Sequence, residues 1–228
     1  MLTPAEWQAV GASLVVGSRA VAVGLPLALG AAWLLARKRF PGRALLDAFV
    51  HAPLVLPPVV VGYALLLVFG VQGPIGHWLD ATFGTRLVFT SAGASLAAGV
   101  MAFPMMVRAM RLALEGIDPG LELAARSLGA RAFDRFFTIT LPLALPGIVA
   151  AAIVGFAACL GEFGAVITFA ANIPGETQTL PLAIYGALQT PGGEQTALTL
   201  ALISLGVAIV ALIAAEILGR WARRWAAR

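Results

Sequence analysis

The stretch that decides the fold is a charged segment, ELAARSLGARAFDRFFTITLP at residues 122–142, which lies between apolar runs. Leu, Ala, Val, Ile and Gly dominate the rest of the chain. Of its 228 residues, 60% are hydrophobic and 11% are charged, and the mean hydropathy is +0.93. A water-soluble domain of this length could not bury so much apolar surface. We therefore predict an all-α polytopic membrane protein whose charged segment lies in water.

Five apolar runs are long enough to cross a membrane as helices. A helix rises 1.5 Å per residue, so about 20 residues span roughly 30 Å of hydrocarbon. No alternating pattern indicates a barrel, and helices satisfy their own backbone hydrogen bonds. Positive charges follow the first apolar run instead of preceding it, which favours a retained span over a cleaved signal peptide. The predicted spans of the single domain 1–228 are residues 15–36, 48–71, 88–107, 146–171 and 197–218.

The basic residues predict which side each connection faces. Of fifteen Lys and Arg residues, four lie in residues 37–43, five in 108–135 and four in 220–228, whereas Arg19 and Arg86 lie on the opposite side. Cytoplasmic connections of membrane proteins carry the excess of Lys and Arg. We therefore predict a periplasmic N-terminus, a cytoplasmic C-terminus and a cytoplasmic charged segment. The same distribution explains the net charge of +4 without invoking nucleic acid.

Within the charged segment the sequence predicts two short helices joined by a bend. Asp118 can cap the first helix, Pro119 is tolerated at its first position, and Gly129 allows a sharp change of direction. We expect the second helix to end at Leu141-Pro142, where the chain re-enters the membrane. Small alanines on the first helix and aromatic residues on the second favour docking of a partner. The alternative is an amphipathic helix on anionic lipid headgroups.

The segment also matches a family pattern: two alanines, three residues, a glycine, nine residues and I-x-L-P. This pattern resembles the cytoplasmic EAA loop of ABC-importer permeases. The resemblance implies a type I ABC importer permease in which residues 118–142 form the coupling helix that docks on the ATPase. The glutamate of the pattern would fall at Leu123, one position after Glu122. The residues implied in ATPase coupling are Glu122, Ala124, Ala125, Gly129, Ile139, Leu141 and Pro142.

Two further stretches narrow the resemblance. LGEFGAVITFAANIPGETQTLP at 160–181 resembles sulfate and molybdate permeases, and HAPLVLPPVVVGYALL at 51–66 is most similar to the molybdate permeases. The resemblance implies a homodimer in the bacterial inner membrane that imports molybdate with cytoplasmic ATP-binding subunits and a periplasmic molybdate-binding protein. Sulfate, thiosulfate and tungstate permeases of the same class are alternatives. An ATPase-independent channel or secondary transporter is the alternative from another class.

No residue pattern indicates an enzyme. The chain has no Walker-type phosphate loop and no nucleophile–base–acid set, so we predict no catalytic residue and expect ATP hydrolysis on a partner chain. Cys159 has no cysteine partner, and His51 and His77 lack the spacing of metal ligands. We therefore predict neither a metal site nor a cofactor.

Five residues are candidates for the transport pathway or its gate. Pro57 and Pro58 interrupt the second span, which is typical of helices that line a pathway, although a simple kink is the alternative. Glu162 is a carboxylate deep in a span, and we expect either a gate or a hydrogen bond that pairs helices. Thr168 and Asn172 lie at the outer end of the fourth span. No arginine is expected at mid-depth, so we predict neutral, weakly binding contacts along the pathway.

Overall fold

The computed structural model describes residues 3–226, and over that range it is helical with no strand. Apart from Arg220, the side chains of the basic cluster 220–228 lie outside the described residues. The helices are α1 (Pro4–Arg37), α2 (Arg43–Val55), α3 (Pro58–Phe69), α4 (Pro74–Phe83), α5 (Ser91–Glu115), α6 (Pro119–Ser127), α7 (Ala132–Arg135), the π-helical turn η1 (Phe136–Thr140), α8 (Leu141–Leu160), α9 (Gly164–Ala170), α10 (Leu180–Leu188) and α11 (Glu194–Ala226).

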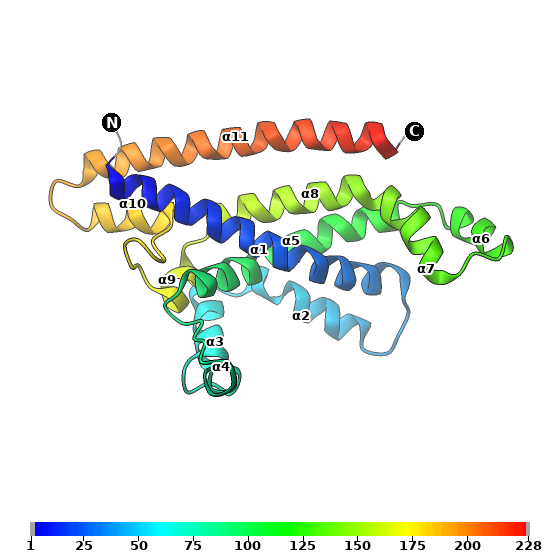
Figure 1. Ribbon diagram of the computed structural model, residues 1–228, viewed down its shortest axis with the longest axis horizontal. Helices are drawn as coiled ribbons and strands as arrows, with labels where there is room; N and C mark the ends of the chain where they lie inside the picture. The colour runs from blue at the N-terminus through cyan, green and yellow to red at the C-terminus, as the bar shows by residue number, and fades with distance from the viewer. Residues whose placement is uncertain (1–2, 227–228) are drawn as a thin grey trace.

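The long helices α1, α5, α8 and α11 run along the longest axis of the molecule (Figure 1). Four described helices are long and apolar enough to span a membrane, and the bent pair of α2 and α3 makes a fifth if it counts as one span. The interior between α1 and α5 is built from small side chains such as Ala28, Ala32, Ala98 and Ala102, none of which is exposed. Small residues let apolar helices approach closely without a hydrophobic driving force. The predicted all-α polytopic architecture is confirmed.

The first helix is longer than the sequence predicted. It begins at Pro4 and not near residue 15, because Thr3 and Glu6 form a capping box that starts the helix early. The Ser13 hydroxyl of this extension accepts a hydrogen bond of 2.7 Å from the backbone N–H of Leu180 in α10. The outer end of α1 is therefore fixed to a segment 167 residues away.

The second predicted span is not a continuous helix. Its two halves, α2 and α3, meet at an angle of 118°. A residue that precedes proline is forced into an extended conformation, and here Leu56 precedes Pro57, which precedes Pro58. The helix is interrupted between Leu56 and Pro58, and the packing of α3 against α9 sets the direction of the second half. The α3–α4 hairpin consequently projects sideways from the long helices (Figure 1).

The fourth span differs from the prediction at both ends. The segment Ala132–Leu160 is one long apolar helical stretch, so the expected end at Leu141-Pro142 is wrong. The reason is the turn η1, in which the Leu141 N–H reaches back to the Phe136 carbonyl and the wider turn accommodates the proline ring. At the other end the helix stops at Leu160, and α9 begins only at Gly164.

The two interrupted segments pack against each other through α3 and α9. A Cβ atom on Gly62 would lie 2.8 Å from both the Ala165 carbonyl oxygen and the Thr168 Cβ. A Cβ atom on Gly164 would lie 2.7 Å from the Pro58 Cβ. We call this contact of Pro58, Gly62, Gly164, Ala165 and Thr168 the α3–α9 junction. Its backbones approach so closely that only glycine fits at both positions.

We predict that Gly62→Ala destabilises the protein. The new methyl group overpacks the α3–α9 junction, at a cost of about 1–3 kcal/mol. This corresponds to a loss of roughly 2–4 °C in the melting temperature per kcal/mol. Thermal unfolding of the purified full-length protein in detergent measures the change.

Gly30→Ala is the matched control, because a Cβ atom at this helical glycine meets nothing within 4 Å. It should leave the melting temperature unchanged or raise it. Equal melting temperatures for Gly62→Ala and Gly30→Ala would contradict the close packing of the junction.

Candidate functional site

The charged segment forms the first predicted short helix, α6, and the predicted bend, whereas the second predicted helix is the start of the long stretch Ala132–Leu160. Asp118 caps α6 by accepting a hydrogen bond of 2.8 Å from the Gly120 N–H. Gly129 has a φ of +85°, which side-chain-bearing residues rarely adopt, and it turns the chain towards α7. Both helices stand at one end of the bundle, beyond α5 and α8 and opposite the N-terminus (Figure 1). We call residues 118–142 the coupling segment.

The outer side of the coupling segment is apolar. Leu128 is 89% exposed and Phe133 is 76% exposed, and Leu121 and Ala124 are exposed on the same helix face as Leu128. Exposed apolar side chains that lie together are typical of interaction surfaces. This surface offers a partner large anchors beside a small residue that permits close approach.

Glu122 points the other way, towards the long helices. Its Oε1 accepts a hydrogen bond of 3.0 Å from the Thr140 hydroxyl and lies 3.3 Å from Arg37 Nη2. The Nε and Nη2 atoms of Arg37 are buried and donate no hydrogen bond among the described residues, so the carboxylate compensates a buried charge. Glu122 therefore joins α6 to the end of α1 and to η1, and we call this contact of Glu122, Thr140 and Arg37 the Glu122 clasp.

The remaining predicted coupling residues divide by position. Ala125 is half-buried on α6, and Ile139, Leu141 and Pro142 are half-buried in η1 and the start of α8. An apolar contact runs beside the clasp, since the rings of Trp33 and Phe136 meet edge to face with centroids 6.5 Å apart. The segment is thus exposed on one side and attached to α1 and α8 on the other.

Four of the five pathway candidates meet around the α3–α9 junction. Pro57 and Pro58 start α3, and Pro58 packs against Gly164. The Glu162 carboxylate accepts a hydrogen bond of 2.8 Å from the Ala165 N–H, so it caps α9. The Thr168 hydroxyl donates to the Gly164 carbonyl at 2.8 Å. Glu162 thereby satisfies an N–H that the start of α9 leaves open, whereas Thr168 adds a second bond to a carbonyl inside the helix.

Asn172 lies apart from the junction, beyond the end of α9. Its amide N–H donates to the Leu182 carbonyl at 3.2 Å, and its amide oxygen accepts from Gln178 at 3.0 Å. Both ends of the amide are occupied by contacts that hold the loop between α9 and α10. The contacts give Asn172 a structural role at the outer end of the fold.

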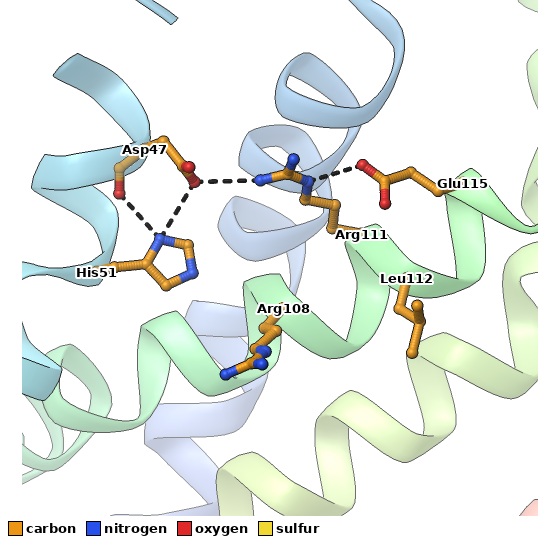
Figure 2. A pocket seen from close by; sticks show the side chains of 6 residues that line it. All are labelled: Asp47, His51, Arg108, Arg111, Leu112 and Glu115. Atoms are coloured by element: carbon orange, nitrogen blue, oxygen red, sulfur yellow. Dashed lines mark hydrogen bonds and ion pairs between the residues drawn. The ribbon is translucent and has the colours of Figure 1, made fainter. Parts of the chain in front are cut away.

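A cavity of about 400 Å³ that no sequence motif predicted lies between α2 and α5. Figure 2 shows the Arg111 guanidinium between two carboxylates, with Nη1 3.2 Å from Asp47 and Nε 2.8 Å from Glu115. His51 Nδ1 lies 2.9 Å from the Asp47 backbone oxygen and 3.3 Å from its carboxylate. Arg108 has no ion-pair partner in the part of the chain that the structure describes. The lining residues are Asp47, His51, Arg108, Arg111, Leu112 and Glu115.

The predicted span 88–107 ended just before these arginines, which were assigned to a cytoplasmic connection. The structure places both on α5, which continues to Glu115. The sequence did contain a signal for these ion pairs. Asp47 and His51 are four residues apart, as are Arg111 and Glu115, and this spacing puts each pair on one face of a helix.

Comparison with known proteins identifies the family. Residues 24–224 match the binding-protein-dependent transport system inner membrane component. The chain belongs to this family. It is 56% identical over 228 residues to the molybdenum transport system permease protein ModB of Escherichia coli K12, with 100% of both chains covered. It is 51% identical over 215 residues to ModB of Haemophilus influenzae, covering 94% of each.

A solved structure shows the same fold. A bacterial ABC transporter involved in the import of the acidic polysaccharide alginate superposes with a TM-score of 0.73 at 17% identity, covering 98% of this chain and 80% of that one. The predicted fold of an ABC-importer permease is confirmed. The chain is accordingly a multi-pass inner-membrane component of a transport system.

We predict that Gly129→Val weakens coupling to the ATPase partner. A β-branched side chain at positive φ costs about 1–2 kcal/mol and shifts the bend between α6 and α7. The protein should still insert into the membrane, but substrate-stimulated ATP hydrolysis by its complex with the ATPase should fall. Hydrolysis by the purified complex is the measurement.

Gly192→Val is the matched control, since Gly192 has a φ of +77° and a Cβ atom there meets nothing within 4 Å. Its loop lies between α10 and α11, away from the coupling segment. Equal hydrolysis in the two variants would contradict a specific coupling role for the bend.

Proposed function

We propose that this chain is the permease subunit of an ATP-driven importer that carries molybdate into the cytoplasm. The observation that carries the proposal is the full-length likeness to ModB of Escherichia coli, whose name describes molybdenum transport. The stretches at 51–66 and 160–181 support it, because their resemblance to oxyanion permeases covers the α3–α9 junction. Sulfate, thiosulfate and tungstate remain the alternative substrates within the class.

The proposal assigns ATP hydrolysis to partner chains. The chain carries no phosphate-binding loop of its own. The exposed face formed by Leu121, Ala124, Leu128 and Phe133 supplies the docking surface for a cytoplasmic ATP-binding subunit. Two copies of the chain form the permease, and each copy binds one ATP-binding subunit.

A periplasmic molybdate-binding protein delivers the ion in this proposal. The family description, a component of binding-protein-dependent systems, supports such a receptor. Of the arginines on the described spans, Arg19 of α1 donates a hydrogen bond of 3.3 Å to the Ser91 hydroxyl. The polar groups at the α3–α9 junction are occupied by backbone groups. Selectivity therefore resides in the receptor, and the permease makes brief, weak contacts with the ion.

Transport by reconstituted components tests the function. Proteoliposomes that contain the permease and its ATP-binding subunits should accumulate molybdate only when both ATP and the receptor are present. Sulfate in excess should compete weakly if molybdate is the substrate. Uptake without ATP would contradict the proposal and indicate a channel or secondary transporter. Preferential uptake of sulfate would show that sulfate, and not molybdate, is the substrate.

We predict the orientation of the chain from its basic residues. In a Cys159→Ala background, Arg131→Cys in the coupling segment should react with a membrane-impermeant thiol reagent only from the cytoplasmic side. Glu176→Cys, in the exposed loop between α9 and α10, should react only from the periplasmic side. Labelling of intact cells and of inverted vesicles distinguishes the two, and the reverse pattern would overturn the orientation.

A further inference from the structure

We propose that the cavity between α2 and α5 is a release site, where the transported tetrahedral oxyanion pauses on Arg108 and His51 before it enters the cytoplasm. The proposal deepens the proposed function and rests on it. It adds a place and two residues that neither the sequence analysis nor the likeness to other permeases assigns.

Arg108 is the first argument. It lies on α5, a candidate membrane span, seven residues before the helix ends at Glu115. This places it about 10 Å along the helix from that end. An arginine on a membrane-spanning helix faces protein or water, because a charge in contact with hydrocarbon is costly. Its side chain lines the cavity and has no ion-pair partner among the described residues, so its charge is available to a ligand.

His51 supplies a second contact. Its Nδ1 lies 2.9 Å from the Asp47 backbone oxygen, which fixes the proton on that nitrogen. Both contacts of the ring among the described residues are made by Nδ1, so the other ring nitrogen is available to a ligand. In the doubly protonated ring this nitrogen is a hydrogen-bond donor, and the Asp47 carboxylate lies 3.3 Å from Nδ1. An oxyanion held by Arg108 would then receive a charge-assisted hydrogen bond from His51.

The other charges keep the site weak. Arg111 is held by Asp47 and Glu115, so its guanidinium is not free for an anion. The two carboxylates also repel a dianion across the same cavity. A weak site with a single free arginine attracts an oxyanion without trapping it, as release into the cytoplasm requires. A tight site would need several convergent donors.

Two sources could supply a tetrahedral oxyanion group here: a free dianion such as molybdate, or the phosphate of a phospholipid headgroup. Both would contact Arg108 through the same oxygen chemistry. The test therefore compares molybdate added to lipid-free detergent with an anionic phospholipid, phosphatidylglycerol, added without molybdate.

The first experiment measures the cavity without requiring transport. Leu112 lines the cavity and is 73% exposed, so Leu112→Cys in the Cys159→Ala background reports on it. In the complete permease–ATPase complex we expect this thiol to react faster with an anionic than with a cationic methanethiosulfonate reagent of similar size. Adding Arg108→Gln should lower that rate ratio by roughly threefold or more. Arg86→Gln, in the loop before α5, is the charge-matched control and should leave the ratio unchanged.

The same thiol reports occupancy. Millimolar molybdate in lipid-free detergent should slow its modification, and the protection should vanish with Arg108→Gln. Protection by phosphatidylglycerol alone would identify a lipid site and overturn the proposal. The proposal would also be overturned if Arg108→Gln left the ratio of the anionic to the cationic modification rate unchanged, or if molybdate gave no protection.

Transport gives the final readout. Arg108→Gln should lower the maximal rate of molybdate uptake by about threefold or more, with the half-saturating concentration of loaded receptor unchanged, because the site acts after delivery. Arg108→Lys should restore part of the rate. If wild-type proteoliposomes take up no molybdate, the proposed function fails. If wild type transports and Arg108→Gln transports equally well, only the release site fails.

Discussion

The interaction that joins the coupling segment to the long helices is the Glu122 clasp. Without it, α6 would be attached to the long helices only by the chain on either side of it and by local packing. The contact between the Phe136 and Trp33 rings would still hold η1 against α1. With the clasp, the carboxylate is held by the Thr140 hydroxyl at 3.0 Å and lies 3.3 Å from the buried Nη2 atom of the partly buried Arg37. A hydrogen bond to a charged group contributes about 1.5–3 kcal/mol, and an uncompensated buried Arg37 would add a further cost. A displacement of α6 is therefore transmitted to α1 and α8 together.

The two sides of α6 make different contacts: one is exposed to solvent, and the other faces the long helices. Leu121, Ala124 and Leu128 form an apolar face that a partner can cover, while Glu122 and Ala125 face the bundle. The glutamate of the family pattern is shifted by one residue in this chain, and the structure gives the carboxylate an internal contact at that shifted position. A one-residue shift on a helix moves a side chain by about 100°, enough to exchange an outward position for an inward one.

Deeper in the membrane, the limiting constraint is the backbone. Hydrocarbon offers no partner to an open N–H or carbonyl group, so a broken span is tolerated only where protein covers the break. Here the break before α3 lies against the break before α9, and Gly62 and Gly164 allow that approach. Glu162 then caps the open end of α9. The two interrupted segments thus pack against each other at the points where their helices break.

Much of the fold was predictable from local chemistry. Hydropathy revealed the spans, and Asp118 and Gly129 predicted the start of α6 and the bend after it. The direction of the chain after Pro57 was not predictable, since the 118° bend depends on where α3 can pack. Pro142 was expected to stop a helix, but the turn η1 absorbs its ring. Arg108 was read as a loop charge because apolar runs were ended at the first charged residue, whereas α5 continues to Glu115.

The central claim, that the Glu122 clasp transmits motion between the ATPase and the membrane helices, is tested most directly by exchanging its charges. The measurement is the amount of molybdate transported per ATP hydrolysed by the reconstituted importer. Glu122→Arg and Arg37→Glu should each lower this ratio, because each places two like charges at the clasp. The double variant should recover a substantial part of it, since the opposite charges are restored with their positions exchanged. Wild-type ratios in both single variants, or a double variant no better than either, would contradict the account.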